Sequence, residues 1–142
     1  MGEVKFEIVQ EKLVTLQQYY QELKDLENIT YNEYCSNNLY KRTAERLIQL
    51  IVEAATDINN ILLKTLDKGI SSDYFSSFLK LAEAGVITMD FALEIAPSTG
   101  LRNIIVHEYQ RIDDELVYES IKKTLKYYLH YMKYINDYIN QP

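Results

Sequence analysis

The sequence is poor in the residues that cross-link or interrupt a chain. It contains one Cys, two Pro and four Gly in 142 residues. An internal disulfide needs two Cys, so the single Cys35 excludes one and agrees with a reducing compartment. An all-β fold needs frequent tight turns, which so few Gly and Pro cannot supply. These absences predict an α-helical protein of the cytoplasm.

Long apolar runs are missing as well, although apolar residues make up 47% of the chain. Each apolar stretch is short and flanked by charge, so we expect no membrane-spanning segment and no membrane association. A length of 142 residues is that of one ordinary domain. We therefore expect a single domain, residues 1–142, with one hydrophobic core.

An excess of positive charge is also absent, because 15 Lys and Arg stand against 21 Asp and Glu, a net charge of -6. Proteins that bind nucleic acid through its phosphates are usually basic, so any RNA-binding surface has to be local. Lys41, Arg42 and Arg46 are the candidates for such a patch. A solvated helix face, paired with Glu45 or Glu53, explains each of these cations equally well.

Apolar residues recur at helical spacing in five stretches, and no convincing strand pattern is present. The spacing predicts long helices over residues 6–23, 47–62 and 116–139, the second of them ending near Gly69. The Asn-rich segment 28–38 predicts a connection. The residues expected on the inner face of the last helix are Leu116, Ser120, Leu125, Tyr128, Met132, Ile135 and Ile139.

Helix-capping residues divide the rest of the chain. Ser71 or Ser72 is suited to cap a third helix, Thr88 a fourth, and Asp113 the last. Pro97 is expected to break or kink the fourth, and the helical pattern resumes at residue 99 or 100 and runs to about residue 106. Long antiparallel helices with short connections predict an up-and-down helical bundle of four to five helices.

The segment of residues 100–109 carries the side chains best suited to chemistry. On a helix, Arg102, Asn103 and His107 fall opposite the apolar residues, and Asn103 and His107 are neighbours at i and i+4. Arg102 and His107 lie about 140° apart on an ideal helix. They are not expected to touch within one chain, but both could line a groove formed with a second subunit.

These residue types suit the cleavage of RNA. The imidazole of His107 can take a proton from the ribose 2′-OH or give one to the leaving oxygen. The guanidinium of Arg102 can hold the phosphate and stabilise the charge of the transition state, and the amide of Asn103 could orient the imidazole or the phosphate. Because the 2′-OH is the nucleophile, no metal is needed. The alternatives stay open, since a single His on a helix is more often a surface residue and Arg is more often salt-bridged.

Two further groups have less to support them. Glu53 and Asp57 form an acidic pair at i and i+4 that could contact the segment 100–109, but two carboxylates alone are not a metal site, and we expect none. A stripe of Tyr residues at helical spacing on the last helix is expected to flank the core, with a contact surface for a partner as the alternative. The stripe consists of Tyr127, Tyr131, Tyr134 and Tyr138.

The chain resembles the HEPN superfamily and, within it, the HepT toxins of HEPN–MNT toxin–antitoxin pairs. Arg102-x4-His107-x-Tyr109 matches the Arg-x4-His-x-Tyr signature of that group, and Asn103 matches the Asn that commonly follows the Arg. Residues 42–58 look like the second helix of the family, and residues 74–86 fit its segment before the active-site helix. The resemblance covers most of the chain. Pro97, close before the motif, is a departure that puts the orientation of Arg102 in doubt.

The resemblance implies a toxin ribonuclease with a helical bundle fold that acts as a homodimer with both sites on a shared cleft. It implies metal-independent cleavage of RNA by Arg102 and His107, without a cofactor. It also implies an MNT-type nucleotidyltransferase antitoxin, which silences the toxin by AMPylation of Tyr109. The alternatives are a catalytically silent HEPN-type module that binds the nucleotidyltransferase or a nucleotide, and a plain helical interaction module.

Overall fold

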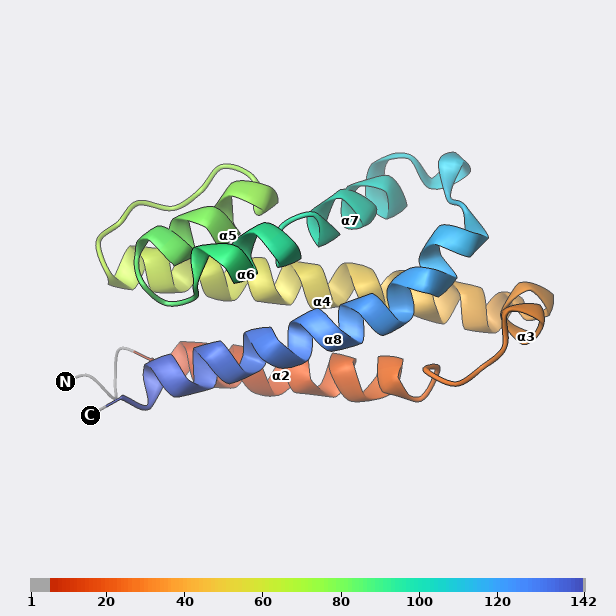
Figure 1. Cartoon of the computed structure of the whole chain (residues 1–142), viewed down its shortest axis with the longest axis horizontal. Coiled ribbons are helices and arrows are strands. Elements are labelled where there is room, and N and C mark those ends of the chain that lie inside the picture. The colour runs from red at the N-terminus through yellow and green to blue at the C-terminus, as the bar shows by residue number, and fades with distance from the viewer. Residues whose placement is uncertain (1–5, 142) are drawn as a thin grey trace.

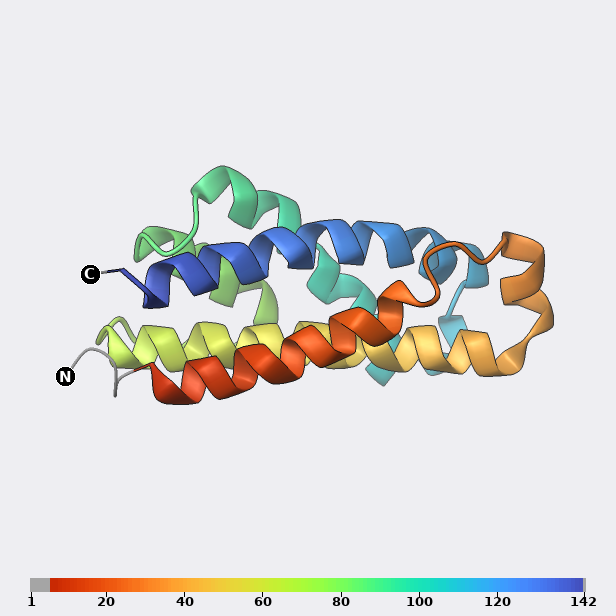
Figure 2. The ribbon, with the colours of Figure 1, turned by 90° about the horizontal axis from the view of Figure 1, so that it is seen from below.

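The computed structural model describes residues 6–141, and every regular element in that range is helical. This confirms the all-α prediction. Three long helices, α2 (Glu7–Lys24), α4 (Asn38–Thr65) and α8 (Asp114–Ile139), lie side by side and bury their apolar faces against one another (Figure 1). The helix α2 runs against the direction of α4 and α8 (Figure 2). Within the described range, no helix is long and apolar enough to cross a membrane.

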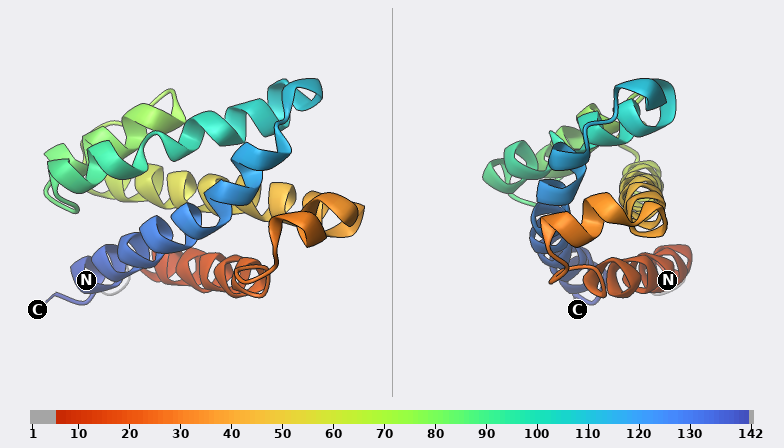
Figure 3. Two further views of the ribbon diagram at one scale, coloured as in Figure 1. Left: turned by 45° about the vertical axis from the view of Figure 1, so that its right-hand side comes forward. Right: turned by 90° about the vertical axis from the view of Figure 1, so that its right-hand side faces the viewer.

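Shorter helices complete the bundle. The chain returns from the end of α4 to the start of α8 along one side of the molecule, and α6 and α7 form this return leg (Figure 3). The short elements are α3 (Tyr31–Ser36), α5 (Tyr74–Glu83), α6 (Met89–Ile95), α7 (Ser98–His107) and the 3₁₀ turn η1 (Tyr109–Arg111). Both α5 and α7 pack against α4, whereas α6 packs against α5 and α8.

The predicted caps are confirmed at two of three helices. The Thr88 hydroxyl accepts a hydrogen bond from the backbone N–H of Phe91 and starts α6, and Asp113 starts α8 in the same way. At the third helix the prediction of Ser71 or Ser72 is wrong. Asp73 caps α5 by accepting from the backbone N–H of Ser76 at 2.7 Å, and this hydrogen bond lowers the pKa of the Asp73 carboxyl.

The segment expected to be only a connection contains the helix α3. Thr30 and Glu33 form a capping box, in which each side chain accepts a hydrogen bond from the backbone N–H of the other residue. Tyr34 of this helix is fully buried in the core. The prediction is therefore wrong for residues 31–36. The many Asn residues favoured a connection, and the Thr-x-x-Glu capping sequence that starts a helix was overlooked.

The buried face of α8 differs from the prediction only near the start of the helix, where it is shifted by one residue. Leu116 is 42% exposed and Ser120 is partly exposed, while Val117 and Ile121 are buried. The remaining predicted residues of this face are buried as expected. The Tyr stripe flanks the core, as predicted: Tyr131 is fully buried and the other three are partly buried against the core.

Pro97 separates α6 from α7. The helix α6 ends at Ile95, and a new helix begins at Ser98, whose hydroxyl donates to the Ile95 carbonyl at 2.7 Å. Because Pro lacks an N–H and clashes with the preceding turn, the chain changes direction at this point. The break lets α7 lie across α4, which brings Arg102 over Glu53.

Candidate active site

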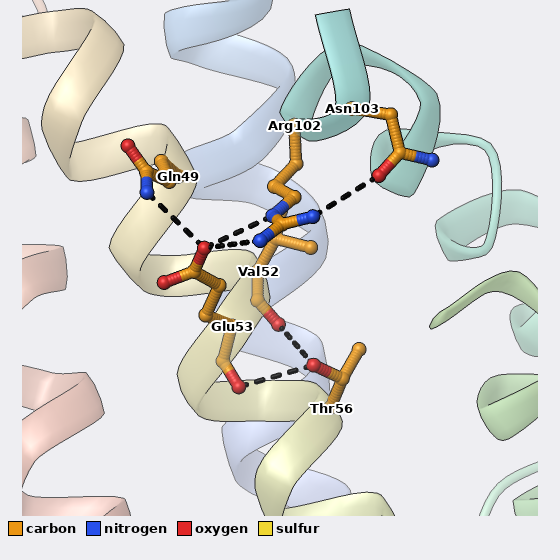
Figure 4. A network of polar contacts seen from close by, with 6 residues as sticks. All are labelled: Gln49, Val52, Glu53, Thr56, Arg102 and Asn103. Atoms are coloured by element: carbon orange, nitrogen blue, oxygen red, sulfur yellow. Dashed lines mark hydrogen bonds and ion pairs between the residues drawn. The ribbon is translucent and has the colours of Figure 1, made fainter. Parts of the chain in front are cut away.

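Arg102 is held by an ion pair between α7 and α4. Its Nη2 and Nε atoms donate to Glu53 Oε2 at 2.6 Å and 3.0 Å, and Gln49 Nε2 donates to the same oxygen at 3.1 Å (Figure 4). The Arg102 side chain is 13% exposed. Water screens such a pair only weakly, and hydrogen bonds between charged groups are stronger than neutral ones. The guanidinium therefore has a defined position on α4.

Two further groups surround the same guanidinium. Asn103 Oδ1 accepts a hydrogen bond from Arg102 Nη1 at 3.3 Å. The ring of Tyr74, the first residue of α5, lies against one face, with 4.5 Å between the ring centroid and the guanidinium carbon. Asn103 thus contacts Arg102, a pairing that the sequence analysis did not predict, and within the described residues no hydrogen bond joins it to His107.

The two carboxylates of the acidic pair on α4 contact residues of two different helices. Glu53 contacts the helix that carries Arg102, as the sequence suggested, whereas Asp57 lies 3.9 Å from Lys12 Nζ of α2. Among residues 6–141, no group of three or more His, Cys, Asp or Glu side chains is placed to hold a metal ion. The role of Glu53 in this structure is to position a cation.

His107 is the last residue of α7, and its side chain is exposed. Within the described range it makes no hydrogen bond or ion pair, to Arg102, to Asn103 or to any other residue. The imidazole is therefore open to solvent. Arg102 and His107 are not brought into contact by one chain, in agreement with their spacing on the helix.

Tyr109 lies in η1, directly after the end of α7, and is 49% exposed. The guanidinium carbon of Arg42 lies 5.4 Å from the centroid of its ring. Arg42 Nη1 also contacts the carboxylate of Glu45, at 3.3 Å. Glu45 is buried, and this burial raises the pKa of its carboxyl, although the charge of Arg42 acts in the opposite direction.

The three candidate RNA-binding cations have different surroundings. Lys41 Nζ lies 3.0 Å from Asp114 at the start of α8, so its charge is partly neutralised. Arg46 is exposed and lines, together with Arg42, a shallow groove between α2 and α4. Glu22 of α2 lies on the opposite side of that groove. Arg42 and Arg46 thus share one surface, while Lys41 is tied to α8.

Sequence reasoning did not identify Tyr74 or Gln49 as neighbours of Arg102. Gln49 precedes Glu53 by one helical turn, so a local signal for this contact existed at i and i+4. Tyr74 meets Arg102 only because α5 and α7 both pack on α4, and no local pattern reports such a contact.

With this geometry in place, comparisons with known proteins identify the family. The model of the ribonuclease HepT-like family matches residues 16–135. This chain belongs to that family. The HepT-like chain is 39% identical over 132 residues to the tRNA nuclease HepT of Aphanizomenon flos-aquae. The aligned region covers 93% of this chain and 90% of that protein. It is 32% identical over 79 residues to the mRNA nuclease HepT of Shewanella oneidensis, covering 56% and 59% of the two chains.

Solved structures show the same fold. The HepT-like chain superposes with a TM-score of 0.82 on the tri-AMPylated HEPN toxin of Shewanella oneidensis in complex with an MNT antitoxin, over 92% of this chain and 97% of that one. The identity in this superposition is 22%, so the likeness shows the HEPN-type helical fold. The predicted fold and family are both confirmed.

Proposed function

We propose that this HepT-like chain is a toxin that cleaves RNA in the cytoplasm as a homodimer, without a metal ion or cofactor. The observation that carries the proposal is the arrangement along α7: Arg102 is fixed and His107 is open to solvent. The family and the nuclease relatives support the same activity.

Arg102 is the proposed phosphate ligand. A guanidinium has five N–H donors, and three of them are used by Glu53 and Asn103. The two remaining donors lie on the Nη groups, where a fork can hold two phosphate oxygens. A donor that is already in place stabilises the negative charge of the pentacoordinate transition state without having to reorganise.

His107 is the proposed proton-transfer group. Its exposed imidazole can reach a bound ribose 2′-OH or a leaving oxygen. One chain offers a single Arg102 and a single His107, which do not touch. A second subunit facing the first would supply another copy of each, so that one imidazole acts as base and the other as acid.

Tyr109 is the proposed site of regulation. It is exposed and follows His107 by two residues, so AMP attached to its hydroxyl would place a negative phosphate where the RNA phosphate binds. The proposed donor of this AMP is an MNT-type nucleotidyltransferase antitoxin. The Shewanella toxin of the same fold is AMPylated and bound to such an antitoxin.

The test is RNA cleavage in EDTA by unmodified protein, comparing the wild type with His107→Ala on tRNA and on a synthetic mRNA. We expect cleavage by the wild type that is lost in the variant. Equal cleavage by both proteins would move the chemistry away from His107. An absence of cleavage by either protein, with an intact mass that shows no adduct, would favour a catalytically silent binding module.

A further inference from the structure

We infer that Tyr74 is a positioning residue for Arg102, and that a buried hydrogen-bond chain through α4 and α8 fixes the backbone of the first turn of α5, which carries the Tyr74 ring. The inference rests on the proposed role of Arg102 in binding phosphate. It assigns a task to a residue outside the Arg-x4-His-x-Tyr motif, on a different helix.

The first argument is the geometry around the guanidinium. Glu53 restrains Arg102 along one edge of the guanidinium, because a single oxygen accepts from both Nε and Nη2. Contacts to one oxygen leave the plane free to pivot about that atom. The Tyr74 ring lies against one face at 4.5 Å and blocks the pivot in that direction. An Arg guanidinium is attracted to an aromatic face, so the contact also stabilises the orientation.

The second argument is the attachment of Tyr74 itself. The hydroxyl of Ser77 donates to the Tyr74 carbonyl at 2.7 Å, and Asn59 Nδ2 donates to that hydroxyl oxygen at 3.0 Å. The hydroxyl of Tyr131 approaches Asn59 Oδ1 at 2.6 Å and the Ala55 carbonyl at 2.9 Å. The chain of contacts therefore runs from α8 through α4 to the first turn of α5.

This chain of contacts is rigid because it is buried. The side chains of Asn59, Ser77 and Tyr131 have no exposed surface. A buried polar group that loses its hydrogen-bond partner destabilises the folded state, so each member of the chain keeps the next in place. Asn59 lies on α4 within two turns of Glu53. The carboxylate that contacts Arg102 is thus on α4, and the first turn of α5, which carries the ring, is anchored to the same helix through Asn59.

The Tyr74 ring, rather than its hydroxyl, makes the contact. Among residues 6–141, the Tyr74 hydroxyl has no hydrogen bond, whereas its carbonyl and its ring are both engaged. Tyr74→Phe should therefore preserve the positioning, and Tyr74→Leu should remove it. Tyr138→Leu is a matched control. Tyr138 lies on α8 and is another partly buried Tyr, and its ring packs edge-on against that of Phe6.

The deciding experiment is ¹H–¹⁵N NMR of the arginine side chains, with the Arg102 Nε–H resonance assigned from Arg102→Lys. In the wild type, the hydrogen bond to Glu53 and the adjacent ring predict slow exchange with water and an upfield ring-current shift. Tyr74→Phe and Tyr138→Leu should keep both features. Tyr74→Leu should move the resonance toward that of free arginine and speed up its exchange.

RNA cleavage provides the second measurement. Tyr74→Leu is expected to lower kcat by about tenfold with KM changed less than threefold, because misorientation acts on the transition state more than on binding. Tyr74→Phe should restore kcat. If thermal denaturation shows that Tyr74→Leu does not fold, Tyr74→Met, which fills the space with a flexible side chain, takes its place.

Tyr74→Leu removes the ring current wherever the guanidinium lies, so the exchange rate decides. An unchanged rate of exchange of the Arg102 Nε–H with water in Tyr74→Leu would overturn the inference, as would a Tyr74→Phe variant as impaired as Tyr74→Leu. The NMR measurement does not depend on activity. If wild-type protein cleaves no RNA while the resonance responds as expected, the proposed function fails and the positioning of Arg102 by Tyr74 stands.

Discussion

Two side chains of α7, Arg102 in the middle of the helix and His107 at its C-terminal end, differ in how firmly they are held. Arg102 is largely buried and contacts Glu53, Asn103 and Tyr74, which come from three different helices. His107, about one and a half turns further on, is exposed and makes no hydrogen bond within residues 6–141. The comparison separates two needs of a catalytic site. A group that stabilises developing charge benefits from a fixed position, and a group that transfers protons needs access to the substrate.

The segment after His107 belongs to the loosely held end. The turn η1 contains no buried residue. The guanidinium of Arg42 lies over the Tyr109 ring, and the Arg42 side chain is itself 57% exposed. A tyrosine that an antitoxin has to modify must be accessible to a second active site. The exposed C-terminal end of α7 therefore suits the proposed regulation, and the buried position of Arg102 suits the proposed binding of a phosphate.

The largest expected effect tests whether cleavage depends on the planar guanidinium of Arg102 and not only on its charge. Arg102→Lys keeps the positive charge but loses the planar fork, so we expect kcat/KM to fall by about 10²–10³-fold. The change should also weaken the contact with Glu53 and lower Tm by roughly 2–5 °C. His107→Ala should abolish cleavage with a Tm change below about 1 °C, because its side chain is exposed. Kinetics and thermal denaturation of both variants measure the contrast.

Two results would remove that contrast. Activity of Arg102→Lys within a few-fold of the wild type would show that charge alone suffices at this position. A large loss of Tm in His107→Ala would show that the exposed end is held more firmly than its contacts indicate.

Much of the fold was predictable because its signals are local. The helical stripes, the caps at Thr88 and Asp113 and the break at Pro97 each depend on residues within a few positions of one another. The inner face of α8 was less predictable, because two overlapping stripes fit the same sequence. One begins at Leu116 and the other at Val117, and only packing against α2 and α4 decides between them.

The site was predictable in the same unequal way. Arg102, Asn103, His107 and Tyr109 were found because they lie in one short motif. Their surroundings were not, since the contact of Tyr74 with Arg102 depends on how α5 and α7 pack on α4. A sequence motif can therefore point to the proposed reacting groups, while the residues that contact them are found only in the tertiary structure.

The next largest effect concerns the exposed end. Tyr109→Phe removes the hydroxyl that would accept AMP, but it keeps the ring over which Arg42 lies. We expect RNA cleavage within about threefold of the wild type and no AMP addition, measured by intact mass after incubation with the nucleotidyltransferase and ATP. Tyr31→Phe is a matched control, because Tyr31 is another exposed Tyr and its change should leave AMP addition unaffected. A large loss of cleavage in Tyr109→Phe would give the hydroxyl a role in the chemistry and place Tyr109 with the catalytic residues.

The smallest effect concerns Glu45, which lies beneath Arg42 and so supports the exposed end. Burial raises the pKa of the Glu45 carboxyl above its ordinary value of 4.5. A carboxyl whose pKa is higher in the folded state stabilises the protein below pH 4.5, and this contribution is lost as the pH rises through the raised value. Glu45→Gln removes the titrating carboxyl. As the pH rises above 4.5, the free energy of unfolding of this variant should therefore increase relative to that of the wild type.

Urea unfolding of the wild type and Glu45→Gln at several pH values between about 2 and 8 measures this difference, a range that includes the acid region in which the stabilisation by carboxylates of low pKa is lost. Asp73→Asn provides a control of opposite sign, because the pKa of Asp73 is lowered by the Ser76 hydrogen bond and its stabilisation is lost as the pH falls. Parallel curves for Glu45→Gln and the wild type would mean that the charge of Arg42 fully compensates the burial of Glu45. Arg42 would then be fixed by a strong ion pair, and the support beneath Tyr109 would be as firm as the one that holds Arg102.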